Sequence, residues 1–351
     1  MRSTITISVA AALLVACQTS VPAEQPAISF AWMVKLGDYV RGTPTVEGGV
    51  LYLGADDNAL YALDVESGET IWRYDTLDNV TSAPAVIDDQ LIFGSWDGKV
   101  YGLDAGQGEL GWTYDTQGWV TASPVVREDT VYVGSHDGIL YALRAGDGER
   151  VWWYQTGGRI QAAAALGNEL VYVGSADNYL YALNVGTGEL GWRYRTDGDI
   201  VSAPALAAQT VYVGSVDRNL YALDAVTGKP RWIFETDGAI ESSPVVTQGL
   251  VYVGANDGIL YALNASDGRS VWQVEAGDII RSSPRVWRNV IFFGSDDGAI
   301  HGLDRRTGEQ VWLYRTGDAI AGAPTIGAGR LFVGSIDRRV HAFELAPDTE
   351  G

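Results

Sequence analysis

The chain contains 351 residues and carries a formal charge of −20, with 24 Lys and Arg against 44 Asp and Glu. This acidity argues against a nucleic-acid partner, because neutralising a phosphate backbone requires clustered basic side chains. A single cysteine excludes an internal disulfide, a four-thiolate zinc site and a thiol redox pair, and three histidines leave few ligands for a metal.

Residues 1–16 are predicted to be a signal peptide. Arg2 precedes the apolar run 5–16, which is too short to span a bilayer but has the length of a secretory h-region. The run ends in "LVAC", which resembles a bacterial lipobox, where the chain is cut before a lipid-modified cysteine. We therefore expect lipidation of Cys17, followed by a flexible tether over residues 17–28. The alternative is an ordinary cleaved signal in which Cys17 is incidental.

The rest of the chain repeats itself every forty residues without insertion or deletion. Glycine recurs at positions 54, 94, 134, 174, 214, 254, 294 and 334. Tryptophan recurs at positions 32, 72, 112, 152, 192, 232, 272 and 312. Aspartate recurs at positions 57, 97, 137, 177, 217, 257, 297 and 337. A period of this length indicates a repeat architecture, and eight copies set its size.

One period predicts four short strands, illustrated by residues 200–206, 210–215, 219–224 and 231–235. Each is rich in Val, Ile, Tyr or Trp and is bounded by Gly or Asp. Four strands per repeat form one blade, so the sequence predicts an all-β, eight-bladed β-propeller over residues 29–345.

Proline indicates which strand lies innermost. It occurs within the first predicted strand of every repeat except the fourth, where Ala164 replaces it. Because proline cannot donate to a ladder, this strand should be an edge strand facing the central channel.

The phase of the repeat predicts how the ring closes. The segment around Trp32 reads as a fourth strand without a blade, and the chain ends in a third strand without a fourth. Residues 29–34 should therefore pair with residues 339–345, leaving 346–351 as a tail. Closing a ring of about 300 residues costs roughly 5 kcal/mol of chain entropy. Burying one Trp contributes about 4–6 kcal/mol at most, which offsets most of that cost.

The residues that determine function should lie at the positions that differ between repeats. Three sets of equivalent positions, which we call columns, differ most between the eight repeats. They lie at one mouth of the predicted channel, because the segment entering the first strand and the turn between strands two and three share one end of a blade. The first column is Tyr39, Asn79, Trp119, Arg159, Asp199, Ala239, Ile279 and Ala319. The second column is Arg41, Thr81, Thr121, Gln161, Val201, Glu241, Arg281 and Ala321. The third column is Asp56, Trp96, His136, Ala176, Val216, Asn256, Asp296 and Ile336.

A candidate binding rim follows from these columns. Blades two to four should bring together Trp96, Trp119, His136, Arg159 and Gln161, a combination of aromatics and Arg that binding hot spots favour. Two further candidates near the mouth are Arg41 and Arg281. The alternative is that these loops vary because nothing constrains them, and the indoles only shield the channel end.

No catalytic group and no metal site are predicted. His301 and His341 occupy the tyrosine slot of the repeat, which favours a structural role. The repeated aspartates stand in tight turns, where a carboxylate caps its own backbone. Paired acids such as Asp56-Asp57 lack the alternating spacing and the closing Glu of a calcium loop.

The pattern "YALDAVTGKPRW" resembles the tryptophan-docking, PQQ-like repeat of quinoprotein propellers, and the resemblance covers residues 29–345. It implies that the Trp of each blade packs against a turn of the next blade. The docking residues are Trp32, Trp72, Trp112, Trp152, Trp192, Trp232, Trp272 and Trp312. Two branches share the repeat, the PQQ-dependent alcohol dehydrogenases and the BamB-type outer-membrane assembly lipoproteins.

The favoured interpretation is a non-catalytic, lipid-anchored periplasmic scaffold, a monomeric ring without cofactor that contacts a protein of outer-membrane assembly. Gln18, rather than Asp, follows Cys17, which by analogy with enterobacterial sorting predicts an outer-membrane lipoprotein facing the periplasm. One alternative is a quinoprotein dehydrogenase that binds PQQ with Ca²⁺, although the chain lacks the adjacent cysteines and long insertions of many members. The other alternative is a ligand or glycan sensor that uses Trp96 and Trp119.

Overall fold

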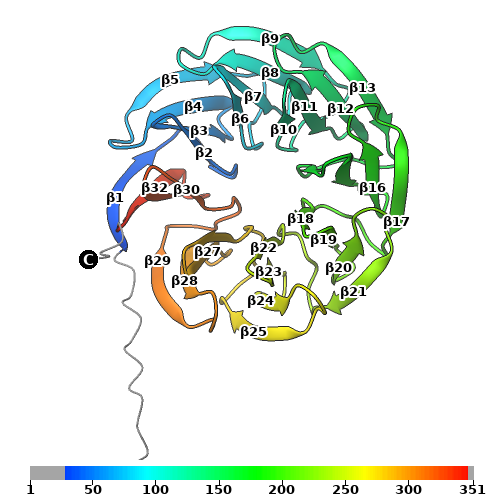
Figure 1. The fold of residues 1–351 in the computed structure, drawn as a ribbon. Helices are drawn as coiled ribbons and strands as arrows, with labels where there is room; N and C mark the ends of the chain where they lie inside the picture. Colours follow the sequence, from blue (N-terminus) through cyan, green and yellow to red (C-terminus); the bar gives the residue numbers. More distant parts are fainter. Residues whose placement is uncertain (1–27, 347–351) are drawn as a thin grey trace, which may run out of the picture.

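The computed structural model describes residues 28–346, which form eight four-stranded antiparallel sheets arranged in a ring (Figure 1). This is the predicted eight-bladed β-propeller, and the described residues contain no helix. It follows that no helix in this part of the chain could cross a bilayer. The predicted signal peptide, Cys17 and the residues after 346 lie outside the described residues.

Each blade runs from an innermost to an outermost strand. The strands are given below in the order of blades 1 to 8. The innermost strands are β2 Thr45–Glu47, β6 Ala85–Ile87, β10 Val125–Arg127, β14 Ala165–Leu166, β18 Ala205–Ala207, β22 Val245–Thr247, β26 Arg285–Trp287 and β30 Thr325–Gly327. The second strands are β3 Val50–Ala55, β7 Gln90–Gly94, β11 Thr130–Gly134, β15 Leu170–Gly174, β19 Thr210–Gly214, β23 Leu250–Gly254, β27 Val290–Gly294 and β31 Arg330–Gly334. The third strands are β4 Ala59–Asp64, β8 Lys99–Asp104, β12 Ile139–Arg144, β16 Tyr179–Asn184, β20 Asn219–Asp224, β24 Ile259–Asn264, β28 Ala299–Asp304 and β32 Arg339–Leu345. The outer strands are β5 Thr70–Asp75, β9 Leu110–Asp115, β13 Arg150–Gln155, β17 Leu190–Arg195, β21 Pro230–Glu235, β25 Ser270–Glu275, β29 Gln310–Arg315 and β1 Ile28–Lys35.

The innermost strand is shorter than predicted. In blade 5 the prediction covered residues 200–206, whereas β18 begins only at Ala205, directly after Pro204. The prolines therefore precede the innermost strands instead of lying within them, because a residue without an N–H cannot join the ladder. The innermost strand is nevertheless an edge strand in every blade, as predicted.

The two ends of the chain close the ring by sharing blade 8. Strand β1 pairs antiparallel with β32, from Ile28 opposite Leu345 to Lys35 opposite Arg339. Figure 1 shows the two strands side by side, although they begin and end the ring. Closure is confirmed, and β1 extends one residue beyond the predicted segment at each end.

The hydrophobic core lies between blades. One cluster, for example, joins Leu51 and Leu53 of blade 1 to Phe332 and Val340 of blade 8. Adjacent blades approach so closely that a Cβ on Gly134 would lie 2.1 Å from Ile160. The repeated glycine therefore serves this contact between blades.

Seven of the eight repeated indoles lie against the next blade. In each case Nε1 donates to a main-chain carbonyl 2.8–3.1 Å away in the turn between the third and outer strands of that blade. The pairs are Trp32–Val65, Trp72–Ala105, Trp112–Ala145, Trp152–Val185, Trp192–Ala225, Trp232–Ala265 and Trp272–Arg305. Trp32 thereby links the closing strand to blade 1.

Trp312 does not follow the implied docking pattern. Its partner turn would follow β32, but β32 ends at Leu345 and, within the described residues, does not turn into an outer strand. The indole instead packs edge-on against Phe343, with ring centroids 5.0 Å apart, and stacks on Tyr314 at 6.3 Å. The split of blade 8 between the two chain ends explains this exception.

The repeated aspartate does more than cap its own turn. In blade 3, Asp137 Oδ1 accepts the Ile139 N–H at 2.9 Å, as the sequence predicted. Its Oδ2 also accepts the Gln117 N–H at 2.9 Å and the Tyr141 hydroxyl at 2.8 Å. Since Gln117 follows the outer strand of blade 2, the carboxylate joins two blades.

His301 and His341 occupy the position that tyrosine holds in most other repeats, and both side chains are buried. His341 is buried, and its Nε2 lies 3.2 Å from Asp337 Oδ2, where other blades place a tyrosine hydroxyl. His301 is buried as well and stacks on Phe293 at 4.7 Å. Burial lowers the pKa of both imidazoles.

Tyrosine–aspartate pairs predict an alkaline limit to stability. Six tyrosine hydroxyls donate to the repeated aspartates at 2.5–2.8 Å: Tyr61, Tyr101, Tyr141, Tyr181, Tyr221 and Tyr261. Burial, followed by the bond to Asp57, raises the pKa of Tyr61 to about 12. An unfolded tyrosine loses its proton near pH 10, so stability present below pH 10 is lost as the pH rises from 10 towards 12.

We therefore expect unfolding, followed by circular dichroism, to begin above pH 10. The Tyr61→Phe variant should unfold at a higher pH, because one proton released on unfolding has been removed. Tyr39→Phe, outside the six pairs, is the matched control and should behave as the unsubstituted protein. A Tyr61→Phe transition at the original pH would contradict this linkage.

Candidate functional site

The three variable columns lie together at one mouth of the ring, as the topology requires. In every blade the N–H of the third-column residue donates to the carbonyl of the first-column residue at 2.8–3.0 Å, as from His136 to Trp119. This backbone contact recurs whatever the side chains are, so it builds a regular frame on which the side chains vary.

Second-column side chains pair with third-column side chains of the same blade. Trp96 Nε1 donates to Thr81 Oγ1 at 2.8 Å, and Asn256 Nδ2 donates to Glu241 Oε1 at 2.7 Å. Sequence reasoning missed Thr81 and Thr121 as partners of the rim aromatics. The sequence does contain a signal for these partners, because Trp96 and Thr81, like His136 and Thr121, are fifteen positions apart.

The predicted aromatic cluster forms across blades 2 and 3. Trp96 and Trp119 are stacked, with ring centroids 4.7 Å apart and planes inclined by 17°. The His136 ring lies 5.5 Å from Trp119 and is tilted by 46° to it. Trp119 remains 48% exposed, whereas Trp96 is half-buried beneath it. The stack therefore presents one indole to the solvent and holds it in place with a second.

His136 is held as a neutral donor. The Thr121 hydroxyl donates to the Gln161 carbonyl at 3.3 Å, so it accepts from His136 Nε2, 3.0 Å away. Burial lowers the pKa of His136, and the nearby Arg159 lowers it further. The imidazole is thus uncharged near neutral pH and carries its proton on Nε2.

Blade 4 adds polar groups beside the stack. Arg159 is exposed, and no carboxylate within residues 28–346 pairs with it. Gln161 has a buried Oε1 without a hydrogen-bond partner. A contacting chain would therefore meet an indole face and a cation within one part of the rim.

Arg41 and Arg281 do not join this cluster. Arg41 Nε lies 3.1 Å from Asp56 Oδ2 in blade 1. Arg281 pairs with Asp296 in its own blade 7 and with Glu241 of blade 6, its Nε lying 3.5 Å from Glu241 Oε2. Both arginines are already neutralised by acids of the rim. Throughout the described segment, no group of three His, Cys, Asp or Glu side chains is placed to hold a metal ion.

These features define a class of protein, an eight-bladed propeller of tryptophan-docking repeats with one asymmetric rim. The chain belongs to the family of the outer membrane protein assembly factor BamB, whose model matches segments 29–113, 67–198, 153–236 and 198–345. No curated protein matches the chain significantly.

Solved structures share the fold at low sequence identity. BamB from Moraxella catarrhalis aligns with a TM-score of 0.80 at 22% identity, over 91% of this chain and 100% of that one. The computationally designed Ika8 protein aligns at 0.80 and 18% identity, over 90% and 100%. A europium-containing methanol dehydrogenase aligns at 0.79 and 16% identity, over 91% and 93%. Identities this low show a common architecture and nothing finer.

Proposed function

We propose that the protein is a non-catalytic scaffold of the bacterial cell envelope, which contacts a protein of the outer-membrane assembly machinery through its asymmetric rim. The observation that carries the proposal is the BamB family match, which spans the whole ring from 29 to 345. The lipobox-like "LVAC" supports a lipid anchor on Cys17 in the periplasmic leaflet of the outer membrane.

The rim over blades 2 to 4 supplies the proposed contact surface. Trp119 offers a large, rigid apolar face at little cost in side-chain entropy, because Trp96 already holds it. Arg159 can pair with an acidic group of the partner without first breaking an ion pair within the described ring. Aromatic and Arg side chains of this kind dominate the binding energy of many protein interfaces.

A quinoprotein dehydrogenase is the second candidate, because dehydrogenases of that class share the fold. PQQ carries three carboxylates, which would require free cations at the mouth. Arg41 and Arg281 do not fit this role, since Asp56, Asp296 and Glu241 already neutralise them. Dye reduction with any alcohol or sugar after addition of PQQ and Ca²⁺ would nevertheless overturn the scaffold proposal.

Replacing Trp96 and Trp119 with alanine should abolish recovery of the partner from cross-linked envelopes. The expected loss is at least tenfold, because two hot-spot aromatics each contribute about 1–2 kcal/mol or more. The melting temperature should fall by no more than about 4 °C, since the stack lies at the surface of the ring. Trp153→Ala is the matched control, because Trp153 is equally exposed, at 48%, but lies on β13 at the outer wall.

The outcomes separate the functions. Recovery of a barrel-assembly protein that disappears only in the rim variant supports the scaffold. Recovery of polysaccharide alone, or of no partner, favours a ligand or glycan sensor. A collapsed melting temperature would show that the indoles serve packing, and the rim would lose its role as a contact surface.

A further inference from the structure

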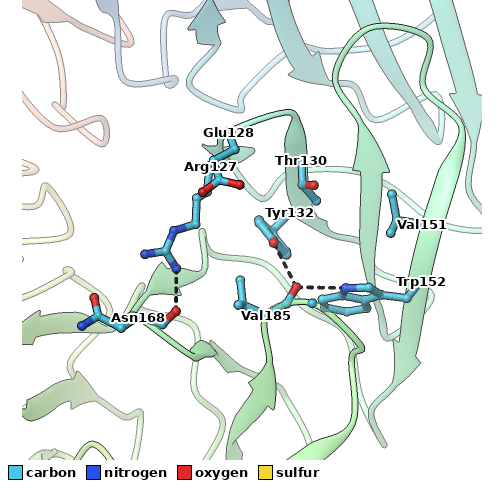
Figure 2. A pocket seen from close by; sticks show the side chains of 9 residues that line it. Arg127, Glu128, Thr130, Tyr132, Val151, Trp152, Asn168 and Val185 are labelled. Atoms are coloured by element: carbon cyan, nitrogen blue, oxygen red, sulfur yellow. Dashed lines mark hydrogen bonds between the residues drawn. The ribbon is translucent and has the colours of Figure 1, made fainter.

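A groove opens between blades 3 and 4 on the face opposite the rim. It is formed by the turn between the first two strands of blade 3 and by two turns of blade 4, and it has a volume of about 310 Å³. Its lining comprises Arg127, Glu128, Thr130, Tyr132, Val151, Trp152, Asn168, Val185 and Gly186 (Figure 2). The volume is at the lower end for a ligand pocket and suits a single side chain.

The floor of the groove is the carbonyl of Val185. Figure 2 shows Tyr132 and Trp152 both directed at it: the tyrosine hydroxyl donates at 3.0 Å and the indole Nε1 at 3.1 Å. The junction of blades 6 and 7 has the same floor. There the carbonyl of Arg305 accepts from Tyr252 at 2.9 Å and from Trp272 at 3.1 Å.

The two junctions differ in the side chain that occupies the space next to this carbonyl. At the second junction the Arg305 side chain fills the groove and is only 3% exposed. Its Nε donates to the Arg288 carbonyl at 2.9 Å, and its Nη2 donates to Gln248 Oε1 and, at 3.4 Å, to Asn289 Oδ1. A groove of this shape therefore accepts a guanidinium, even with uncharged acceptors.

A third junction shows the same chemistry. Between blades 8 and 1, Arg330 forms two hydrogen bonds of 2.6 Å to the carboxylate of Glu66. At the corresponding positions of blades 3 and 4 stand Thr130 and Gly186, which leave the space open. The ring thus fills two such grooves with Arg305 or Arg330, whereas the arginine that lines this one, Arg127, comes from the innermost strand and leaves the space open.

The open groove and the turn beside it carry carboxylates where the junction of blades 6 and 7 has amide side chains. Glu128 replaces Gln248, Glu169 replaces Asn289, and Val185 replaces the arginine itself. Carboxylates bind a guanidinium more strongly than amide oxygens do. At this junction the sequence therefore has no arginine at the position of Arg305, and it places one carboxylate, Glu128, in the lining and a second, Glu169, in the adjacent turn.

Arg127 reduces this excess without cancelling it. Its Nη1 donates to the carbonyls of Gly167 and, at 3.1 Å, of Asn168, as Figure 2 shows for Asn168. A carbonyl oxygen has two lone pairs, so the Asn168 carbonyl can accept a second donor. Within the lining Arg127 balances Glu128, so the excess negative charge is that of the exposed Glu169 in the turn beside the groove.

We propose that this groove docks an arginine side chain from a basic segment of a partner protein. The methylene stem would lie along Tyr132 and Trp152, with the guanidinium between Glu128 and the Asn168 carbonyl. The formal charge of −20 favours approach of such a segment. The inference does not depend on the role proposed for the rim.

The test is a titration of the full ring with acetyl-Gly-Arg-Gly-amide, followed by NMR at the Val185 and Gly186 amides and the Trp152 indole. We expect saturable shifts at these three signals with a Kd on the order of 1 mM. The same peptide with citrulline in place of arginine should bind at least about tenfold more weakly, because it lacks the charge.

Two variants make the assignment specific. Val185→Arg should fill the groove as Arg305 does and abolish the response, while Glu128→Gln, at an exposed turn position, should weaken binding about three- to tenfold. Equal binding of the citrulline peptide, or an unchanged response in Glu128→Gln, would overturn the proposal. Free arginine binding as tightly as the peptide would overturn the assignment to a partner segment.

Discussion

Replacing Trp32 with alanine should destabilise the protein by about 3–5 kcal/mol, the usual cost of removing a packed Trp. The indole lies at the point where the ring closes: Nε1 donates to Val65 of blade 1 at 2.9 Å, and the ring packs against Phe332 of blade 8 at 5.8 Å. Its loss weakens the hold of β1, whose detachment would expose the edge of β32.

Urea denaturation and limited proteolysis measure this effect. Met33→Ala is the matched control, because Met33 is the next residue on β1 but is 49% exposed, and it should change the free energy of unfolding by less than about 0.5 kcal/mol. Cleavage within residues 28–35 should appear early in Trp32→Ala. Equal stability of the two variants would show that the closing strand is held by its backbone pairing alone.

Replacing Gly228 with alanine should cost about 3 kcal/mol, from two separate causes. Gly228 has φ of +69°, where an L-residue loses about 1–2 kcal/mol. Its new Cβ would also lie 2.6 Å from the Trp192 ring, which overpacks the docking contact at a further 1–3 kcal/mol. The indole would have to move away from the Ala225 carbonyl, now 3.0 Å from its Nε1.

Gly249→Ala separates the two causes. Gly249 has φ of +79°, but a Cβ there would meet nothing within 4 Å, so only the backbone cost should remain. Combining Gly228→Ala with Trp192→Ala should cost less than the sum of the single variants, since the clash then has no partner. Additive costs in thermal or urea unfolding would rule out a clash between this turn and the indole.

Part of the rim was predictable from the repeat. A fixed period places Trp96, Trp119 and His136 at the same end of adjacent blades, and the structure stacks the two indoles with the imidazole tilted beside them. The forty-residue period does not indicate which of the rim side chains already form ion pairs within the ring. Arg41 and Arg281 stand in the same columns as the stack, yet acids fifteen positions away neutralise them.

The groove between blades 3 and 4 was not predictable in this way. Its character depends on the absence of a bulky side chain at Val185 and Gly186 and on the carboxylate of Glu128 in its lining. Only comparison with Arg305 in the folded ring showed what such a space holds.

The sequence alone determined the number of blades, the presence and order of four strands in each blade, and the closure of the ring by residues from both ends. These properties follow from backbone pairing and from the spacing of apolar residues, which a strict forty-residue period records directly. The tertiary structure alone decided that the prolines precede the innermost strands, how Trp312 packs without a docking turn among residues 28–346, and which charges on the rim are free. Those properties depend on which backbone groups and side chains come within hydrogen-bonding distance, inside a blade and between blades, and only the folded ring sets those distances.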